Sequence, residues 1–65
     1  MARYFFDVHF DHAVHRDCKG LELPNLDEAI AEANHARTEI MAEDELLRLK
    51  IEIIDQEGRV VATVG

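Results

Sequence analysis

Three histidines and one cysteine recur at every third position early in the chain, as His9, His12, His15 and Cys18. Imidazole nitrogens and thiolates are ligands that zinc prefers in proteins, and four of them complete a closed tetrahedral site. Structural zinc sites usually take two short ligand pairs, separated by a longer segment that folds around the metal. Here all four residues fall within ten positions, which favours a solvated polar loop with one histidine at the end of a strand. We therefore expect no cofactor, and zinc held by these four residues is the alternative hypothesis.

Cys18 is also the first residue to consider as a nucleophile. His15 precedes it by three positions, and the basic residues Arg16 and Lys19 lie beside it, which would help to activate a thiol. A nucleophilic enzyme also needs an oxyanion site and a cleft, and a short chain with one helix offers little concave room. The chain contains no serine, and its 3 glycines are isolated, so it has no glycine-rich phosphate loop. These observations predict a protein that is not an enzyme.

The chain is short and acidic. Its 65 residues predict one small domain over residues 1–65, and 14 acidic against 7 basic residues give a formal net charge of −7. Because the basic residues are scattered and this charge opposes contacts to phosphate, we expect no binding to nucleic acid. No apolar run approaches the roughly 18 residues that cross a membrane, and no signal peptide is evident. A single cysteine excludes an internal disulfide, so we expect a cytoplasmic protein.

The elements that must position these side chains begin with a strand over residues 3–10. Aromatic and β-branched residues occupy every second position there, which is typical of a strand. Residues 11–20 are polar and irregular. Residues 20–23 form a short extended segment that can pair back onto the first strand before Pro24 ends it, because proline cannot donate to a ladder.

Asn25 marks the start of a helix, because asparagine is a favoured N-cap and Glu28 stands three positions on, as in a capping box. Three acidic residues at 43–45 would meet the negative end of the helix dipole, so we expect the helix to end between residues 43 and 46. Apolar residues at helical spacing form its buried stripe: Leu26, Ala29, Ile30, Ala33, Ile40 and Met41.

Two further strands are predicted over residues 49–54 and 59–64. Asp55 and Gly58 occupy the first and last positions of the turn between them, as a type I turn with a glycine bulge prefers. The pattern leaves the register open between a three- and a four-residue loop. The predicted fold is therefore α+β, an antiparallel sheet of three or four strands with one helix packed on one face, in the order β-(β)-α-β-β.

Three stretches together resemble a family of short bacterial domains of unknown function: R-Y-F-F-D-V at the start, G-L-E-L-P-N-L-D-E-A in the middle and D-Q-E-G-R-V at the end. Members of that family open with R-Y-F-F, carry G-x-E-L-P-D-L where the helix starts, and finish with a D-x-x-G-R hairpin. This chain has Asn25 where the family often has aspartate, and either residue caps a helix. The resemblance implies no activity for any residue. A weaker resemblance, at the level of the fold, is to HicB-like antitoxin domains.

Three of the predicted strands contain two adjacent bulky apolar residues: Phe5-Phe6, Ile53-Ile54 and Val60-Val61. Adjacent strand residues point to opposite faces, so both faces of the sheet carry apolar groups, and one helix covers only one face. Chains this short also commonly need a metal or a partner chain. We therefore expect a homo-oligomer, in particular a homodimer that covers the second face or pairs sheet edges. The functional hypothesis is a small non-catalytic interaction or regulatory module that self-associates and binds a further protein, and the alternative is a metal-binding or metal-sensing domain.

Overall fold

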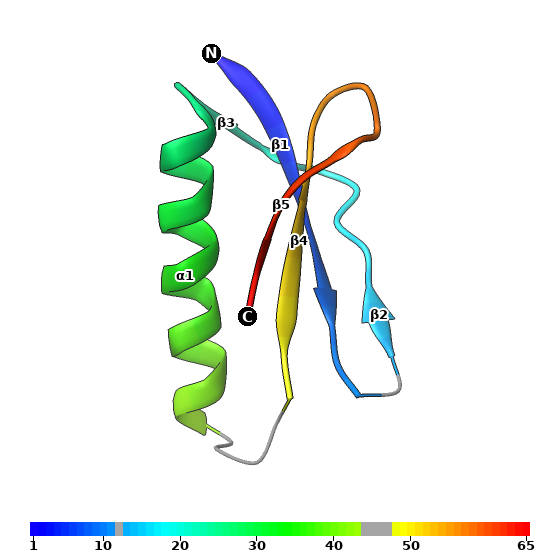
Figure 1. Ribbon diagram of the computed structural model, residues 1–65, viewed down its shortest axis with the longest axis vertical. Coiled ribbons are helices and arrows are strands. Elements are labelled where there is room, and N and C mark those ends of the chain that lie inside the picture. The colour runs from blue at the N-terminus through cyan, green and yellow to red at the C-terminus, as the bar shows by residue number, and fades with distance from the viewer. Residues whose placement is uncertain (12, 44–47) are drawn as a thin grey trace.

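The computed structural model describes residues 1–11, 13–43 and 48–65. Within them, five antiparallel strands form one sheet and a single helix, α1, packs on one of its faces (Figure 1). This arrangement confirms the predicted α+β fold and adds β2, a two-residue strand in a stretch predicted to be irregular. In chain order the elements are β1 (Ala2–His9), β2 (Val14–His15), β3 (Leu21–Leu23), α1 (Leu26–Glu43), β4 (Lys50–Ile54) and β5 (Val60–Val64).

The helix begins where the sequence predicts. Asn25 caps it, because its Oδ1 accepts the backbone N–H of Glu28 at 2.9 Å. Asp27 and Glu28 in the first turn complement the positive end of the helix dipole. Together these features stabilise the first turn of α1.

The most deeply buried residues that α1 turns toward the sheet are small, and the larger Leu26 and Ile30 pack beside them. Ala29 and Ala33 are 0% and 1% exposed, which allows the helix to approach the strands closely. The described helix extends to Glu43, within the predicted range for its end. The remaining predicted end positions, 44–46, and the side chain of Met41 lie outside the described part. No helix in the described ranges has the length and apolar character needed to cross a membrane.

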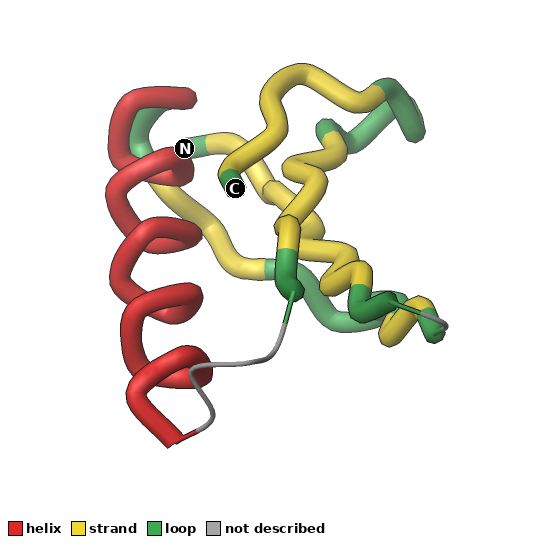
Figure 2. Tube along the Cα trace, turned by 60° about the horizontal axis from the view of Figure 1, so that its bottom comes forward, coloured by secondary structure: helices red, strands yellow, loops and turns green. Residues whose placement is uncertain are grey.

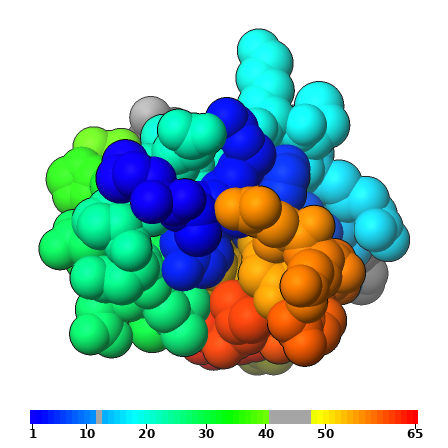
Figure 3. Space-filling view, turned by 90° about the horizontal axis from the view of Figure 1, so that it is seen from above, coloured from blue at the N-terminus to red at the C-terminus, as the bar shows by residue number. Residues whose placement is uncertain are grey.

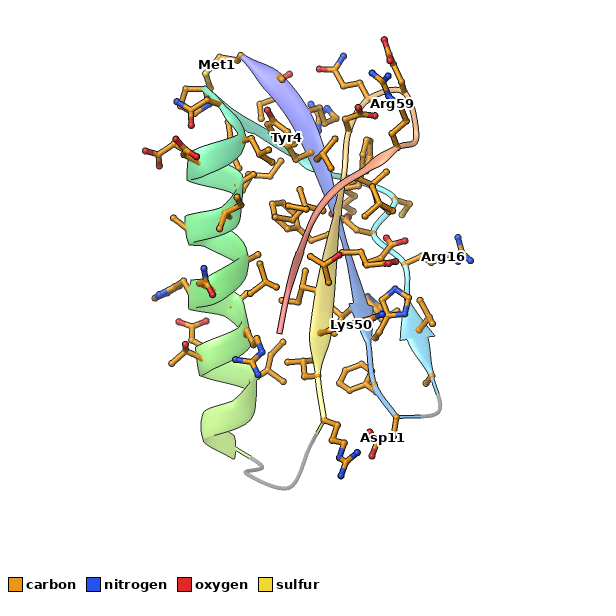
Figure 4. The ribbon with its side chains drawn as sticks, in the orientation of Figure 1. Met1, Tyr4, Asp11, Arg16, Lys50 and Arg59 are labelled. Atoms are coloured by element: carbon orange, nitrogen blue, oxygen red, sulfur yellow. The ribbon has the colours of Figure 1, made fainter. Side chains whose placement is uncertain are left out.

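The core lies between α1 and the sheet. Ile51 and Ile53, alternate residues of β4, are 1% and 0% exposed, and Tyr4 and Val64 from the neighbouring strands join them. Figure 2 shows α1 along one side of the strands, and Tyr4 lies between α1 and the sheet in Figure 4. The intervening residues of each strand point to the other side, which we call the open face.

β1 is an interior strand, because the sheet order is β2-β1-β4-β5 and β3 also pairs with β1. β2 pairs with the end of β1 and β3 with its beginning, so residues 16–20 connect two strands on the same edge of β1. On the other edge, Phe5 opposes Ile54, and Asp7 opposes Glu52. Directly opposed residues share a face, so these four side chains start from the open face.

The hairpin between β4 and β5 has the predicted turn. The backbone N–H of Asp55 donates to the Arg59 carbonyl at 2.9 Å, and that of Gly58 donates to the Asp55 carbonyl at 3.1 Å. Gly58 has a φ of 83°, the left-handed conformation that this turn needs. The loop is therefore residues 56–58, which settles the register that the sequence left open.

A β-bulge follows the turn. Ile54 pairs with Val60. The preceding Ile53 pairs with Ala62, so Val61 is an extra residue on β5. Val60 and Val61 therefore both stand opposite Ile54, instead of alternating regularly between the two faces.

Candidate functional site

Two histidines of the predicted zinc motif, His9 and His15, have side chains on opposite faces of the sheet. His9 ends β1 on the open face, where its Nε2 lies 2.7 Å from Oε1 of Glu52. His15 in β2 pairs with Val8, the neighbour of His9, so its side chain starts from the opposite face. The two imidazoles therefore diverge, and one ring nitrogen of His9 is already engaged by a carboxylate.

Of the remaining two residues of the motif, Cys18 is described by the structure and His12 is not. Cys18 is exposed in the segment after β2, and Arg16 beside it points away from the sheet (Figure 4). His12 lies outside the described residues, so the set of four zinc ligands as a whole stays a prediction. Among the residues that are described, no three His, Cys, Asp or Glu side chains are placed to hold a metal ion.

Asp17 organises the segment that carries these residues. Its Oδ1 accepts the backbone N–H groups of Lys19 at 3.0 Å and Gly20 at 3.1 Å. Its Oδ2 accepts the backbone N–H of Phe6, in β1, at 3.2 Å. Partial burial raises the pKa of this carboxyl, but the three backbone donors and the nearby His15 outweigh burial and hold the pKa below its ordinary value.

Asp7 completes this arrangement from β1. It is 6% exposed, and its Oδ1 accepts the backbone N–H of Asp17 at 3.1 Å. Gly20 packs so closely that a Cβ there would lie 3.0 Å from the ring of Phe5. The two aspartates thus tie residues 16–20 to β1, and the segment lies against Phe5 at the margin of the open face.

Four apolar side chains form a continuous row on the open face. Phe5 opposes Ile54 across β1 and β4, and both are half-buried. On β5, Val60 and Val61 both stand opposite Ile54 of β4, and they are 52% and 37% exposed. We call these four residues the apolar row. No helix covers them in the described structure, because α1 lies on the other face (Figure 2).

Two hollows in the described part are small. One of about 280 Å³ lies beside His9, Arg48 and Lys50, and one of about 210 Å³ lies beside Arg3 and Asp55. Sites for small molecules usually enclose about 300–1,000 Å³. The apolar row is therefore a stronger candidate for a functional surface than either hollow.

The sequence predicts apolar side chains on both faces of the sheet, and the structure places Phe5 and Ile54 on the face away from the helix. The sequence does not reveal the roles of Asp7, in the predicted first strand, and of Asp17, in the stretch predicted to be irregular. A signal was available for one of them, because Asp17 begins the pattern D-x-x-G that also forms the turn at residues 55–58. No local pattern marks the contact of Asp7.

The model of the family described as Domain of unknown function (DUF6894) matches residues 3–65. That range includes α1 and every described strand apart from the first residue of β1. Neither the curated proteins nor the solved structures give a match.

Proposed function

We propose that this chain, which belongs to the DUF6894 family of domains of unknown function, is a small non-catalytic module that self-associates as a homodimer and contacts a further protein. The observation that carries the proposal is the apolar row. Val60 and Val61 keep about half and a third of their surface in water, directly beside the half-buried Ile54. A contiguous apolar surface of this kind is typical of an interaction site.

The size of the chain supports the same proposal. Among the residues whose burial is described, the largest fully buried side chains are Ile51 and Ile53, so this core is thin. Small domains with thin cores commonly gain stability from a disulfide, a metal or a partner. The single cysteine, Cys18, cannot form an internal disulfide, and a second copy of the chain supplies a partner without any further component.

We further propose a cytoplasmic location and no affinity for nucleic acid. The exposed thiol of Cys18 suits a reducing compartment. The net charge of −7 opposes contacts to phosphate, so no salt-sensitive binding to duplex DNA or RNA is expected at physiological ionic strength. Measurable binding of that kind would contradict this part of the proposal. A regulatory role is part of the proposal, as the weaker resemblance of the sequence to HicB-like antitoxin domains would imply.

The test is the molar mass in solution, measured by size-exclusion chromatography with light scattering, together with melting at several protein concentrations. A dimer is expected, and its Tm should rise with concentration because folding and association are linked by mass action. Val60→Asp should raise the dimer dissociation constant at least tenfold, because it places a charge in the apolar row. Val14→Asp is the matched control, since Val14 is 48% exposed but lies on β2, at the far edge of the sheet.

Phe5→Asp is a harsher variant of the same kind, and we expect either a monomer or an unfolded chain, since Phe5 is half-buried. For this reason Val60 is the better probe. A fully folded monomer whose Tm does not depend on concentration would contradict the proposed self-association. Equal loss of the dimer in Val60→Asp and Val14→Asp would show that added negative charge, and not the apolar row, governs association.

A further inference from the structure

The outer edges of β1 and β5 differ in whether their backbone groups are paired. The outer edge of β1 is closed along its length by β3 at one end, by β2 at the other, and by the Asp17 carboxylate on the Phe6 N–H between them. The outer edge of β5 has no such cover, because β5 ends the strand order and no other described strand pairs with it. In Figure 1, β5 crosses in front of β4, with α1 to one side of it.

The composition of this uncovered edge is unusual for the chain. β5 reads V-V-A-T-V, with no charged residue and no proline, although 32% of the chain is charged. Natural proteins usually protect an exposed edge with lysine, proline, a bulge or a covering segment. The bulge at Val61 distorts only the hairpin end of β5, and the strand continues in regular pairing from Ala62 to Val64. That regular part of the edge therefore contains no lysine, no proline and no bulge.

We propose that β5 pairs antiparallel with β5 of a second copy of this chain, which joins the two sheets into one; this inference rests on the proposed self-association. A twofold axis makes any strand edge complementary to itself, so no second kind of surface is needed. Two chains of net charge −7 repel each other, and the neutral β5 edge lets them approach without opposing like charges. Figure 3 shows β5 (red) at the margin of the molecule, between α1 (green) and the hairpin (orange).

This pairing has a defined geometry. An antiparallel pair related by a twofold axis keeps the faces of the sheet aligned, so both copies of α1 lie on the same face of the joined sheet. Both apolar rows then lie together on the other face, with Val60 and Val61 of each copy next to the new junction. The backbone groups of β5 that do not bond to β4 bond to the second copy, because the residues of an antiparallel strand direct their groups alternately to either side.

The decisive experiment is amide hydrogen exchange of the whole chain, followed by NMR at protein concentrations above and below the dimer dissociation constant. Alternate amides of β5, those that do not donate to β4, should exchange at least tenfold more slowly in the dimer. A dimer in which these amides exchange as fast as in the monomer would overturn edge pairing, while leaving the proposed self-association intact. A chain that stays monomeric at every concentration would overturn both.

A pair of lysine variants provides a second measurement. Thr63→Lys puts a charge on the regular part of β5, and the new ammonium group lies opposite Glu52, which favours retention of the monomer fold. The two copies of this lysine repel each other across the junction, so the dissociation constant should rise at least tenfold. Val14→Lys adds the same charge on β2 and should leave association unchanged. Unaltered association of Thr63→Lys would contradict pairing through β5.

Discussion

The carboxylate of Asp17 accepts the backbone N–H of Phe6 at 3.2 Å, across eleven positions of sequence, and so fills the gap in the edge of β1 between β2 and β3. The same carboxylate closes its own turn through the N–H groups of Lys19 and Gly20. One side chain therefore serves both the local turn and the long-range contact. This double role makes Asp17 the residue whose loss should free the segment of residues 16–20 from the sheet.

Asp17→Ala removes an acceptor shared by three backbone donors. Hydrogen bonds to a charged group stabilise by more than neutral ones, so we expect a loss of about 1–3 kcal/mol in the free energy of unfolding. The measurement is urea denaturation followed by circular dichroism. Asp11→Ala is the matched control, because Asp11 is an exposed aspartate nearby, and its replacement should change stability by less than about 0.5 kcal/mol. Equal stability of the two variants would contradict the role assigned to Asp17.

The stability of the fold should fall in acid because of Asp17 and Asp55. Both carboxyls have a pKa below the ordinary 3.8, Asp17 because its backbone donors outweigh partial burial, and Asp55 mainly because it accepts the N–H of Arg59. A pKa that is lower in the folded state means that the unfolded state binds more protons. The resulting stabilisation is complete above the ordinary pKa and is lost as the pH falls through the folded values.

Urea midpoints measured from pH 7 down to pH 2.5 should therefore stay level above about pH 5 and fall steeply below about pH 4. Asp17→Asn cannot titrate at this position, so its midpoints should start lower at pH 7 and fall less in acid than those of the unmodified chain. Parallel curves for the two proteins would show that Asp17 does not couple to folding through its charge.

The two D-x-x-G turns show which local structures can be predicted from the sequence and which cannot. The turn at residues 55–58 was predicted because two alternating strands flank it, and it formed as predicted. The turn at residues 17–20 has the same pattern, but its flanking strands have only two and three residues, too few to show a period. Its main contact, to Phe6, is tertiary, and a local pattern cannot specify such a contact.

The candidate surface was predictable in part for a similar reason. Alternation correctly separated Phe5 from Phe6 and Ile54 from Ile53, since these residues lie in regular strand pairing. It failed for Val60 and Val61, because strict alternation would put the two valines on opposite faces. The bulge that places both valines opposite Ile54 depends on the pairing register of the two hairpin strands. The sequence does not determine this register, because both strands have apolar residues on both faces.

The two turn glycines make a matched pair for a test of packing. Gly20 and Gly58 both have positive φ, 71° and 83°, so alanine at either position adopts a strained backbone that costs about 1–2 kcal/mol. A Cβ at Gly58 would meet nothing within 4 Å, whereas one at Gly20 would lie 2.8 Å from Cγ of Arg3 and 3.0 Å from the carbonyl oxygen of Tyr4. Gly20→Ala should therefore cost about 1–2 kcal/mol more than Gly58→Ala, in line with the usual cost of overpacking.

Thermal melting of the two alanine variants checks this prediction, because the backbone strain is common to both and the difference reports the packing of residues 16–20 on β1. If Gly58→Ala were as destabilising as Gly20→Ala, the close contact of this segment with Phe5 and Arg3 would not contribute to the free energy of unfolding.

Removal of metal should leave the fold intact. The core, the hairpin and the hydrogen bonds accepted by Asp17 involve none of the histidines, and Nε2 of His9 already lies 2.7 Å from a carboxylate oxygen of Glu52. If zinc were structural, its binding free energy would be part of the folding free energy, and chelation would unfold the chain. We expect excess chelator to shift the Tm by less than about 1 °C, against several degrees for a change of 1 kcal/mol in a domain of this size.

Weak binding of divalent metal at neutral pH is nevertheless expected, since His15 and Cys18 are exposed three positions apart. A double variant, His15→Ala with Cys18→Ala, should abolish it, whereas His35→Ala, which removes an exposed histidine from α1, should not. The measurements are metal content after purification without an affinity tag, and zinc titration by calorimetry. Stoichiometric zinc together with a large fall in Tm on chelation would replace the interaction module with the metal hypothesis, and would make His9, His12, His15 and Cys18 its ligands.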